Sequence, residues 1–216
     1  MLQPEAVIWD FNGTILNDTD LSTSAINELL KRRRLPAITR ESHRNGFRFP
    51  IVDYYRGLGF DLEKESFSDI SDEFHYIYFE GVSKCELNTG VAEALATIKG
   101  LGIRQFVLSA AEQGMLDSWV KTVGVHDFFE GIYGLQDQLA VSKVDRAREL
   151  MESFGLAGER TVLIGDTDHD GEVAKAIGCD VILVPIGHQS HERIKQTKCR
   201  FVDSVDEIIG LVRGWE

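Results

Sequence analysis

Residues 7–15 read Val-Ile-Trp-Asp-Phe-Asn-Gly-Thr-Ile, a short apolar run that ends on a carboxylate. The run predicts a buried β-strand. Because open parallel sheets bind ligands beyond the carboxyl ends of their strands, Asp10 is expected to face a crevice. Gly13 allows the chain to turn away sharply after it. Taken alone, the segment fits equally well an Asp that only ends a strand and caps a turn.

Polar residues follow in three further segments, in a fixed order along the chain. They are Ser109, Lys143, and Asp166 with Asp170. The first and the last follow apolar runs of the strand type, and the second stands at the start of an amphipathic helix. Because the ends of such elements meet at one edge of a parallel sheet, we expect these groups to share a crevice with Asp10.

This ordered set resembles the haloacid dehalogenase superfamily of phosphatases and phosphotransferases. Those enzymes carry D-x-D-x-T, then a Ser or Thr, then a Lys, then an acidic G-D-x-x-x-D type motif. The residues that match are Asp10, Thr14, Ser109, Lys143, Gly165, Asp166 and Asp170. The resemblance spans positions 7–186 and is similar to a phosphoglycolate-phosphatase-like branch. Each motif alone is weak, but the ordered set is specific.

The resemblance implies phosphoryl transfer through an aspartyl-phosphate formed on Asp10. A nucleophilic carboxylate of this kind splits one difficult step into two easier ones. Ser109 would donate a hydrogen bond to a phosphoryl oxygen, and Lys143 would balance the charge of Asp10 and the bound phosphate. Thr14 would have a structural or substrate-positioning role.

The resemblance also implies a Mg²⁺ site made of oxygen ligands. Asp10 and Asp166 would bind the cation directly, together with the main-chain carbonyl of Asn12, and Asp170 would support it. Two carboxylates in one turn can reach a single hard, octahedral cation. The neighbouring Asp168 is interpreted as a solvated helix start, because an acidic side chain suits a helix N-terminus.

Two histidines near these motifs are assigned no catalytic role. His169 is interpreted as a surface or capping residue, since Mg²⁺ disfavours imidazole. His188 follows the apolar run 181–184 and could approach the site, but it is interpreted as part of the loop structure.

Asn12 departs from the family pattern. The residue two after the nucleophile is normally an Asp that protonates the leaving oxygen and later activates water. An amide can do neither, and general acid–base assistance is worth ~10² to 10⁴ in rate. Asn12 therefore places efficient hydrolysis in doubt while leaving the metal site intact.

Residues 17–86 predict an all-helical insertion of about four helices. Apolar residues recur at helical spacing in two strong stripes, near residues 21–30 and 67–82. The resemblance identifies this insertion as a C1 cap. Within it, His43, Arg44 and Arg48 are candidate contacts for a substrate carboxylate or a second anion.

Residues 1–16 and 87–216 predict the catalytic core. Strand-like and helix-like runs alternate from residue 89 onward, which favours a parallel sheet covered on both faces. The expected strands are 103–108, 161–164 and 181–184, with a poorer candidate at 131–135. The fold class is therefore α/β, a three-layer Rossmann-like parallel-sheet core with an inserted helical cap.

Composition limits the classes of partner. A net charge of −12 argues against nucleic-acid or anionic-membrane binding. Three cysteines without metal-ligand spacing make a disulfide framework or a zinc site improbable. No segment approaches the ~20 apolar residues of a membrane span. We expect a cytoplasmic protein, monomeric or homodimeric, whose partner is a small phosphorylated metabolite.

These observations predict a Mg²⁺-dependent phosphatase-like hydrolase, with phosphoglycolate as the substrate guess. The alternative is a catalytically weak or inactive phosphate-binding or interaction module that kept the fold and the metal site. A phosphomutase is a weaker third possibility, because it too needs an acid at position 12.

Overall fold

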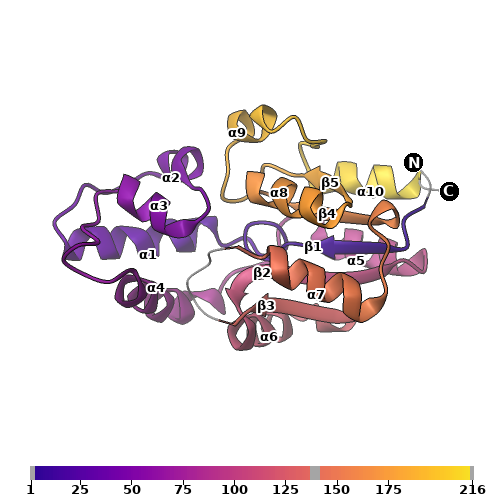
Figure 1. Cartoon of the computed structure of the whole chain (residues 1–216), viewed down its shortest axis with the longest axis horizontal. Coiled ribbons are helices and arrows are strands. Elements are labelled where there is room, and N and C mark those ends of the chain that lie inside the picture. The colour runs from indigo at the N-terminus through magenta and orange to yellow at the C-terminus, as the bar shows by residue number, and fades with distance from the viewer. Residues whose placement is uncertain (1–2, 137–141, 215–216) are drawn as a thin grey trace.

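The computed structural model describes residues 3–136 and 142–214, and its centre is a five-stranded sheet (Figure 1). All of the strand pairs are parallel, and the spatial order is β3-β2-β1-β4-β5. The strands are β1 (Ala6–Trp9), β2 (Arg104–Glu112), β3 (Gly131–Leu135), β4 (Thr161–Gly165) and β5 (Asp180–Leu183). The predicted parallel sheet is confirmed, including the poorer candidate at 131–135.

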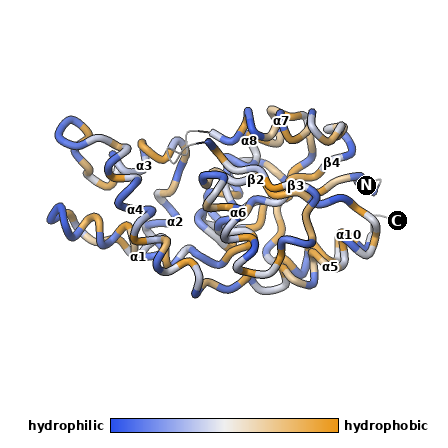
Figure 2. Tube along the Cα trace, turned by 90° about the horizontal axis from the view of Figure 1, so that it is seen from below, coloured by the Kyte–Doolittle hydropathy of each residue, from blue (hydrophilic) through white to orange (hydrophobic). Residues whose placement is uncertain are grey.

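Helices cover both faces of the sheet and make a three-layer core. Side chains of a strand alternate between the two faces. Val7 and Trp9 of β1 therefore pack in one hydrophobic cluster, and Ala6 and Ile8 in another. The first cluster includes residues of α5 (Val91–Gly100), α6 (Gln113–Thr122) and α10 (Val205–Arg213), and the second includes residues of α7 (Val144–Phe154) and α8 (Asp168–Ile177). Strand β1 consists of four buried apolar residues, whereas the helices mix hydrophobic and hydrophilic residues (Figure 2).

Four helices form a separate lobe beside the core (Figure 1). They are α1 (Thr19–Arg32), α2 (Arg40–Gly46), α3 (Ile51–Gly57) and α4 (Phe67–Val82). Their apolar faces enclose a hydrophobic cluster of their own, which includes Leu29, Tyr54 and Ile70. The helical periodicity predicts such an all-helical lobe, which is called the cap from here on; its role as a cap stays a prediction.

The chain enters and leaves the cap through two adjacent segments. Leu16 and Leu87 form an antiparallel bridge. The amide of Asn17 donates to the carbonyl of Glu86, and the amide of Asn88 donates to that of Ile15, both at 2.9 Å. The cap is thus joined to the core by an isolated antiparallel bridge directly after the turn that follows Asp10.

Helix α9 (His191–Gln196) follows β5 and precedes α10. None of the helices in the described part of the chain combines the length and the apolar character that a membrane span requires. The side chains of Cys85, Cys179 and Cys199 are free thiols.

Candidate active site

Three buried carboxylates meet at the carboxyl edge of the sheet. Asp10 follows β1 and Asp166 follows β4, and these strands are neighbours. Asp170 lies in the first turn of α8. Asp10, Asp166 and Asp170 each offer an oxygen, and these oxygens all lie within 4.8 Å of one another. The strand-end rule therefore places the predicted acidic residues together.

Lys143 lies among these carboxylates. It precedes α7, and its Nζ pairs with Asp10 and, at 2.7 Å, with Asp170 Oδ1. Burial alone would lower the pKa of Lys143, but the two carboxylates raise it above its ordinary value. Lys143 is therefore an ammonium ion at physiological pH.

The cluster places three carboxyl groups around one ammonium group. Burial raises the pKa of Asp10 well above its usual range; Lys143 opposes this, and Asp170 and Asp166 add to it. Burial also raises the pKa of Asp166, against the opposing charge of His188. Carboxylates that repel one another in a buried site form a donor set that fits a divalent cation.

The oxygens of Asp166 and Asp170 are held by hydrogen bonds. Asp166 accepts from the Thr14 hydroxyl at 3.0 Å and from the His188 amide at 2.5 Å. Asp170 Oδ2 accepts from the amide of Thr167 at 3.0 Å and from its hydroxyl at 2.7 Å, in a capping box at the start of α8. Among the described residues, Oδ1 of Asp170 pairs only with Lys143, and its Oδ2 is taken up by Thr167, so the supporting role assigned to Asp170 fits this geometry.

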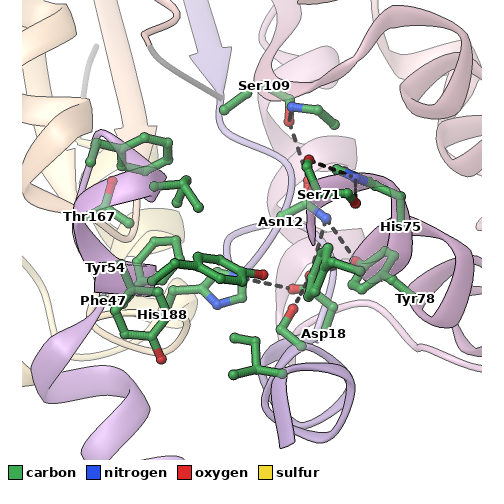
Figure 3. A pocket seen from close by; sticks show the side chains of 18 of the residues that line it. Asn12, Asp18, Phe47, Tyr54, Ser71, His75, Tyr78, Ser109, Thr167 and His188 are labelled. Carbon is green, nitrogen blue, oxygen red and sulfur yellow. Dashed lines mark hydrogen bonds and ion pairs between the residues drawn. The ribbon is translucent and has the colours of Figure 1, made fainter. Parts of the chain in front are cut away.

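The side chain of Asn12 is held by three polar neighbours (Figure 3). Its Nδ2 donates to Asp18 Oδ2 at 3.1 Å and lies 2.9 Å from Tyr78 Oη, and its Oδ1 accepts from Ser109 at 3.3 Å. Tyr78 in turn donates to Asp18 Oδ2 at 2.6 Å. An amide, unlike a carboxylate, can donate to Asp18, and this accounts for Asn at position 12.

His188 lies in the loop after β5, as interpreted, and its side chain also lines the cavity that contains Asp10. Its Nε2 lies 3.3 Å from Asp18 Oδ1, and its Nδ1 lies 3.1 Å from His43 Nε2. Burial alone would lower the pKa of His188, but Asp18, with help from Asp166 and Asp10, raises it to about 9. Burial and the nearby charge of His188 lower the pKa of His43 to about 3. The pair is therefore a cationic His188 beside a neutral His43.

This ion pair predicts a loss of stability at alkaline pH. The folded-state pKa of His188 is above its unfolded value, so its contribution is complete below pH 6.5 and is lost as the pH rises through about 9. We expect the metal-free unfolding free energy to fall by roughly 3 kcal/mol over this window. Urea unfolding measures this free energy at each pH. The His188→Gln protein should have a lower unfolding free energy at neutral pH, and that free energy should depend little on pH. A flat wild-type profile would contradict the assigned charge.

The three cap residues predicted to contact substrate divide into two groups. His43 lines the cavity that contains Asp10. Arg44 does not, because its guanidinium donates to the carbonyls of Pro185, Gly187 and Gln189 at 2.6–3.0 Å. Arg48 is exposed and donates to the carbonyl of Gly46 at 3.3 Å. The structure therefore does not bring either arginine to Asp10, and Arg44 instead ties α2 to the loop after β5.

Arg44→Ala should therefore act on the junction between cap and core. Charge-assisted hydrogen bonds contribute about 1.5–3 kcal/mol, and partial exposure places the expected loss of unfolding free energy near ~2 kcal/mol. Chemical denaturation measures this loss. Arg48→Ala is the matched control and should change stability by less than ~0.5 kcal/mol. Equal effects of the two substitutions would argue against the junction role.

Two residues of the acidic turn also differ from their interpretations, Asp168 as a solvated helix start and His169 as a surface or capping residue. His169 is buried, pairs with Glu172 at 2.9 Å and stacks on Phe49 with ring centroids 4.5 Å apart. Asp168 pairs with Arg193 at 2.6 Å and so connects α8 to α9. Both residues are structural, and neither is in the carboxylate cluster.

Comparisons with known proteins identify the family of this chain. A family model described as haloacid dehalogenase-like hydrolase matches residues 7–184. The chain is 25% identical to a phosphoglycolate phosphatase from Nitrosococcus oceani over 97% of each sequence. It is 24% identical to the tyrosine-protein kinase PtkA from Mycobacterium tuberculosis, over 95% of this chain and 71% of that protein.

A solved structure has the same fold. A haloacid dehalogenase-like family hydrolase from Streptococcus pneumoniae superposes with a TM-score of 0.84 at 18% identity, covering 96% of this chain and 98% of that one. The family match and the relatives confirm the resemblance that the ordered motifs predict. The chain belongs to the haloacid dehalogenase-like hydrolase family.

Proposed function

We propose that the protein is a Mg²⁺-dependent phosphomonoesterase that acts on a small phosphorylated metabolite. The observation that carries the proposal is the buried cluster of Asp10, Asp166 and Asp170 around Lys143 at the carboxyl edge of the sheet. A nucleophilic carboxylate, a cation beside it and a second acidic strand end are the parts that phosphoryl transfer needs.

In the first step, a carboxylate oxygen of Asp10 attacks phosphorus and the bond to the leaving oxygen breaks. Lys143 holds Asp10 in place and offsets the charge that gathers on the phosphoryl oxygens. Ser109, whose hydroxyl lies beside Asn12, donates to one of these oxygens. Water then hydrolyses the aspartyl-phosphate, releasing inorganic phosphate and restoring the carboxylate of Asp10.

Mg²⁺ would be held by Asp10, Asp166 and the main-chain carbonyl of Asn12, with Asp170 in support. When bound, it neutralises phosphoryl charge and orients the substrate. Thr14 fixes the direction of the Asp166 carboxylate through its 3.0 Å hydrogen bond.

Asp166→Ala should abolish the response of the enzyme to Mg²⁺. The wild-type protein should lose activity in a chelator and recover it when Mg²⁺ is added, whereas the variant should stay at least ~10-fold slower at any Mg²⁺ concentration, because the loss even of a group that supports a metal ligand costs about 10–100-fold in affinity or activity. Steady-state phosphate release measures both responses. Full wild-type activity in the chelator would exclude the metal assignment.

A catalytically weak phosphate-binding or interaction module is the second candidate, and Asn12 is the observation that favours it. Acetyl phosphate separates the two, because its leaving group needs little protonation. Turnover of acetyl phosphate supports the enzyme, and binding of inorganic phosphate without any turnover supports the module. In either case we propose a cytoplasmic monomer or homodimer that binds neither nucleic acid nor membranes.

A further inference from the structure

The cavity in front of Asp10 has an aromatic wall. It has a volume of about 140 Å³, and its lining runs from Asp10 and Asn12 to apolar side chains of the cap. The aromatic part of the lining includes Phe47, Phe49, Tyr54, Phe74, Tyr78 and Trp119. Figure 3 shows Phe47 and Tyr54 grouped on one side of this space and Asn12 with Tyr78 on the other. The group attached to the phosphate would therefore lie against aromatic rings.

Among the described residues, the lining of the cavity offers no spare cation for a second anionic group. Of the described residues that line it, Lys143 and His188 are the cations, and both are already paired with carboxylates. The predicted anion contacts Arg44 and Arg48 lie elsewhere. Because a buried carboxylate without a partner costs several kcal/mol, phosphoglycolate does not fit this lining.

The chemistry at position 12 selects the leaving group. Asn12 cannot protonate the leaving oxygen. An alkoxide is a poor leaving group without a proton, since alcohols ionise with pKa values close to the ~15.7 of water. A phenoxide ionises near ~10 and leaves far more readily. The amide of Asn12 and the aromatic wall therefore both favour a substrate with an aromatic leaving group.

We propose that the substrate is an aryl phosphate, the phosphate monoester of a single-ring phenol. The size of the cavity agrees, because an apolar cavity of ~150 Å³ takes up benzene. The carboxylate of Asp10 attacks phosphorus, the phosphorus–aryl oxygen bond breaks, and the phenoxide leaves with the bonding electrons and takes a proton from water. A second water hydrolyses the aspartyl-phosphate. This inference rests on the proposed phosphomonoesterase function and names its substrate class.

A substrate panel with Mg²⁺ tests the proposal. Phenyl phosphate should exceed cyclohexyl phosphate, its alkyl counterpart of similar size, by at least ~10² in kcat/KM, the lower end of what general acid assistance supplies. The kcat/KM for phenyl phosphate should exceed that for phosphoglycolate by a still larger factor. If acetyl phosphate is hydrolysed but phenyl phosphate is no better than phosphoglycolate, the aryl assignment is wrong and the phosphatase stands. If none of the four is hydrolysed, the proposed function fails.

Binding gives a readout that does not depend on turnover. Trp119 lines the cavity, so its fluorescence should report a ring placed there. Phenylphosphonate, which cannot be hydrolysed, should bind at least ~10-fold more tightly than methylphosphonate, as burial of an apolar ring predicts. Equal affinities would overturn the ring site even in a protein that hydrolyses phosphate esters.

A matched pair of variants locates the ring. Ile51 begins α3 and lines the cavity, whereas its neighbour Val52 is also half-buried but does not line it. Ile51→Trp should reduce kcat/KM for phenyl phosphate at least ~10-fold more than for acetyl phosphate, because the larger side chain fills space that the ring needs. Val52→Trp should leave unchanged the ratio of kcat/KM for phenyl phosphate to kcat/KM for acetyl phosphate. The same ratio in both variants would contradict the placement of the ring in this cavity.

Discussion

Replacing Asp10 by Asn is expected to reduce phosphomonoester turnover by at least ~10⁴ while the protein stays folded. The amide keeps the shape of the side chain but cannot attack phosphorus. Asp10 is also one of three carboxylates that share a buried site with a single lysine, and burial and its acidic neighbours raise its pKa. Removing its charge should therefore leave the melting temperature of the metal-free protein unchanged or higher.

Two measurements together test this prediction. Turnover of phenyl and acetyl phosphate reports the nucleophile, and thermal unfolding of the metal-free protein reports the electrostatic strain in the cluster. Lys143→Met is a useful contrast, because it leaves the carboxylates without their paired cation and should destabilise the fold by about 3–5 kcal/mol. An Asp10→Asn protein with wild-type activity, purified free of host phosphatases, would refute the aspartyl-phosphate mechanism.

The fold and the acidic cluster could be predicted from sequence because both follow from local patterns. Apolar runs predict parallel strands, and the strand-end rule then brings Asp10 and Asp166 to one edge without any knowledge of the packing. The helical periodicity of residues 17–86 likewise predicts the cap. Lys143 joins the cluster because it starts the helix that follows β3.

The cap side of the site could not be predicted in this way. Whether an arginine faces substrate depends on what satisfies its donors, and Arg44 is satisfied by three backbone carbonyls from a loop that is far away in the sequence. The pairing of Asp18 with His188 also crosses from the start of the cap to the loop after β5. His188 did carry one signal, its position after a strand end. Asp18 carried none beyond its place two residues after the junction.

Asn12 is a residue for which the sequence predicts one part of the behaviour and the structure reveals another. The motif shows that an acid is missing, and the structure shows what the amide does instead, since it donates to Asp18 and lies beside Tyr78. An Asp at position 12 would therefore lie beside the buried carboxylate of Asp18. Restoring the family residue therefore affects stability as well as catalysis.

Asn12→Asp is expected to destabilise the protein by about 2–4 kcal/mol, because it removes a donor to Asp18 and places two carboxylates about 3 Å apart. Unfolding in urea measures this change. Asn12→Ala removes the donor without adding charge and should cost less. Combining Asn12→Asp with Asp18→Asn should cost less than the sum of the two single changes, by a coupling of roughly 2 kcal/mol. Additive costs would show that the two side chains do not interact.

The same variant should gain activity on poor leaving groups. Two adjacent carboxylates retain a proton, so the carboxyl group introduced at position 12 would hold the proton that Asn12 cannot supply. We expect kcat/KM for cyclohexyl phosphate to rise toward ~10²-fold and kcat/KM for phenyl phosphate to change little, because kcat/KM reports only the steps up to departure of the leaving group and phenoxide leaves without assistance. A gain confined to the alkyl ester would identify the missing proton as the limit on turnover. An equal change for both esters would mean that protonation of the leaving oxygen does not limit this enzyme.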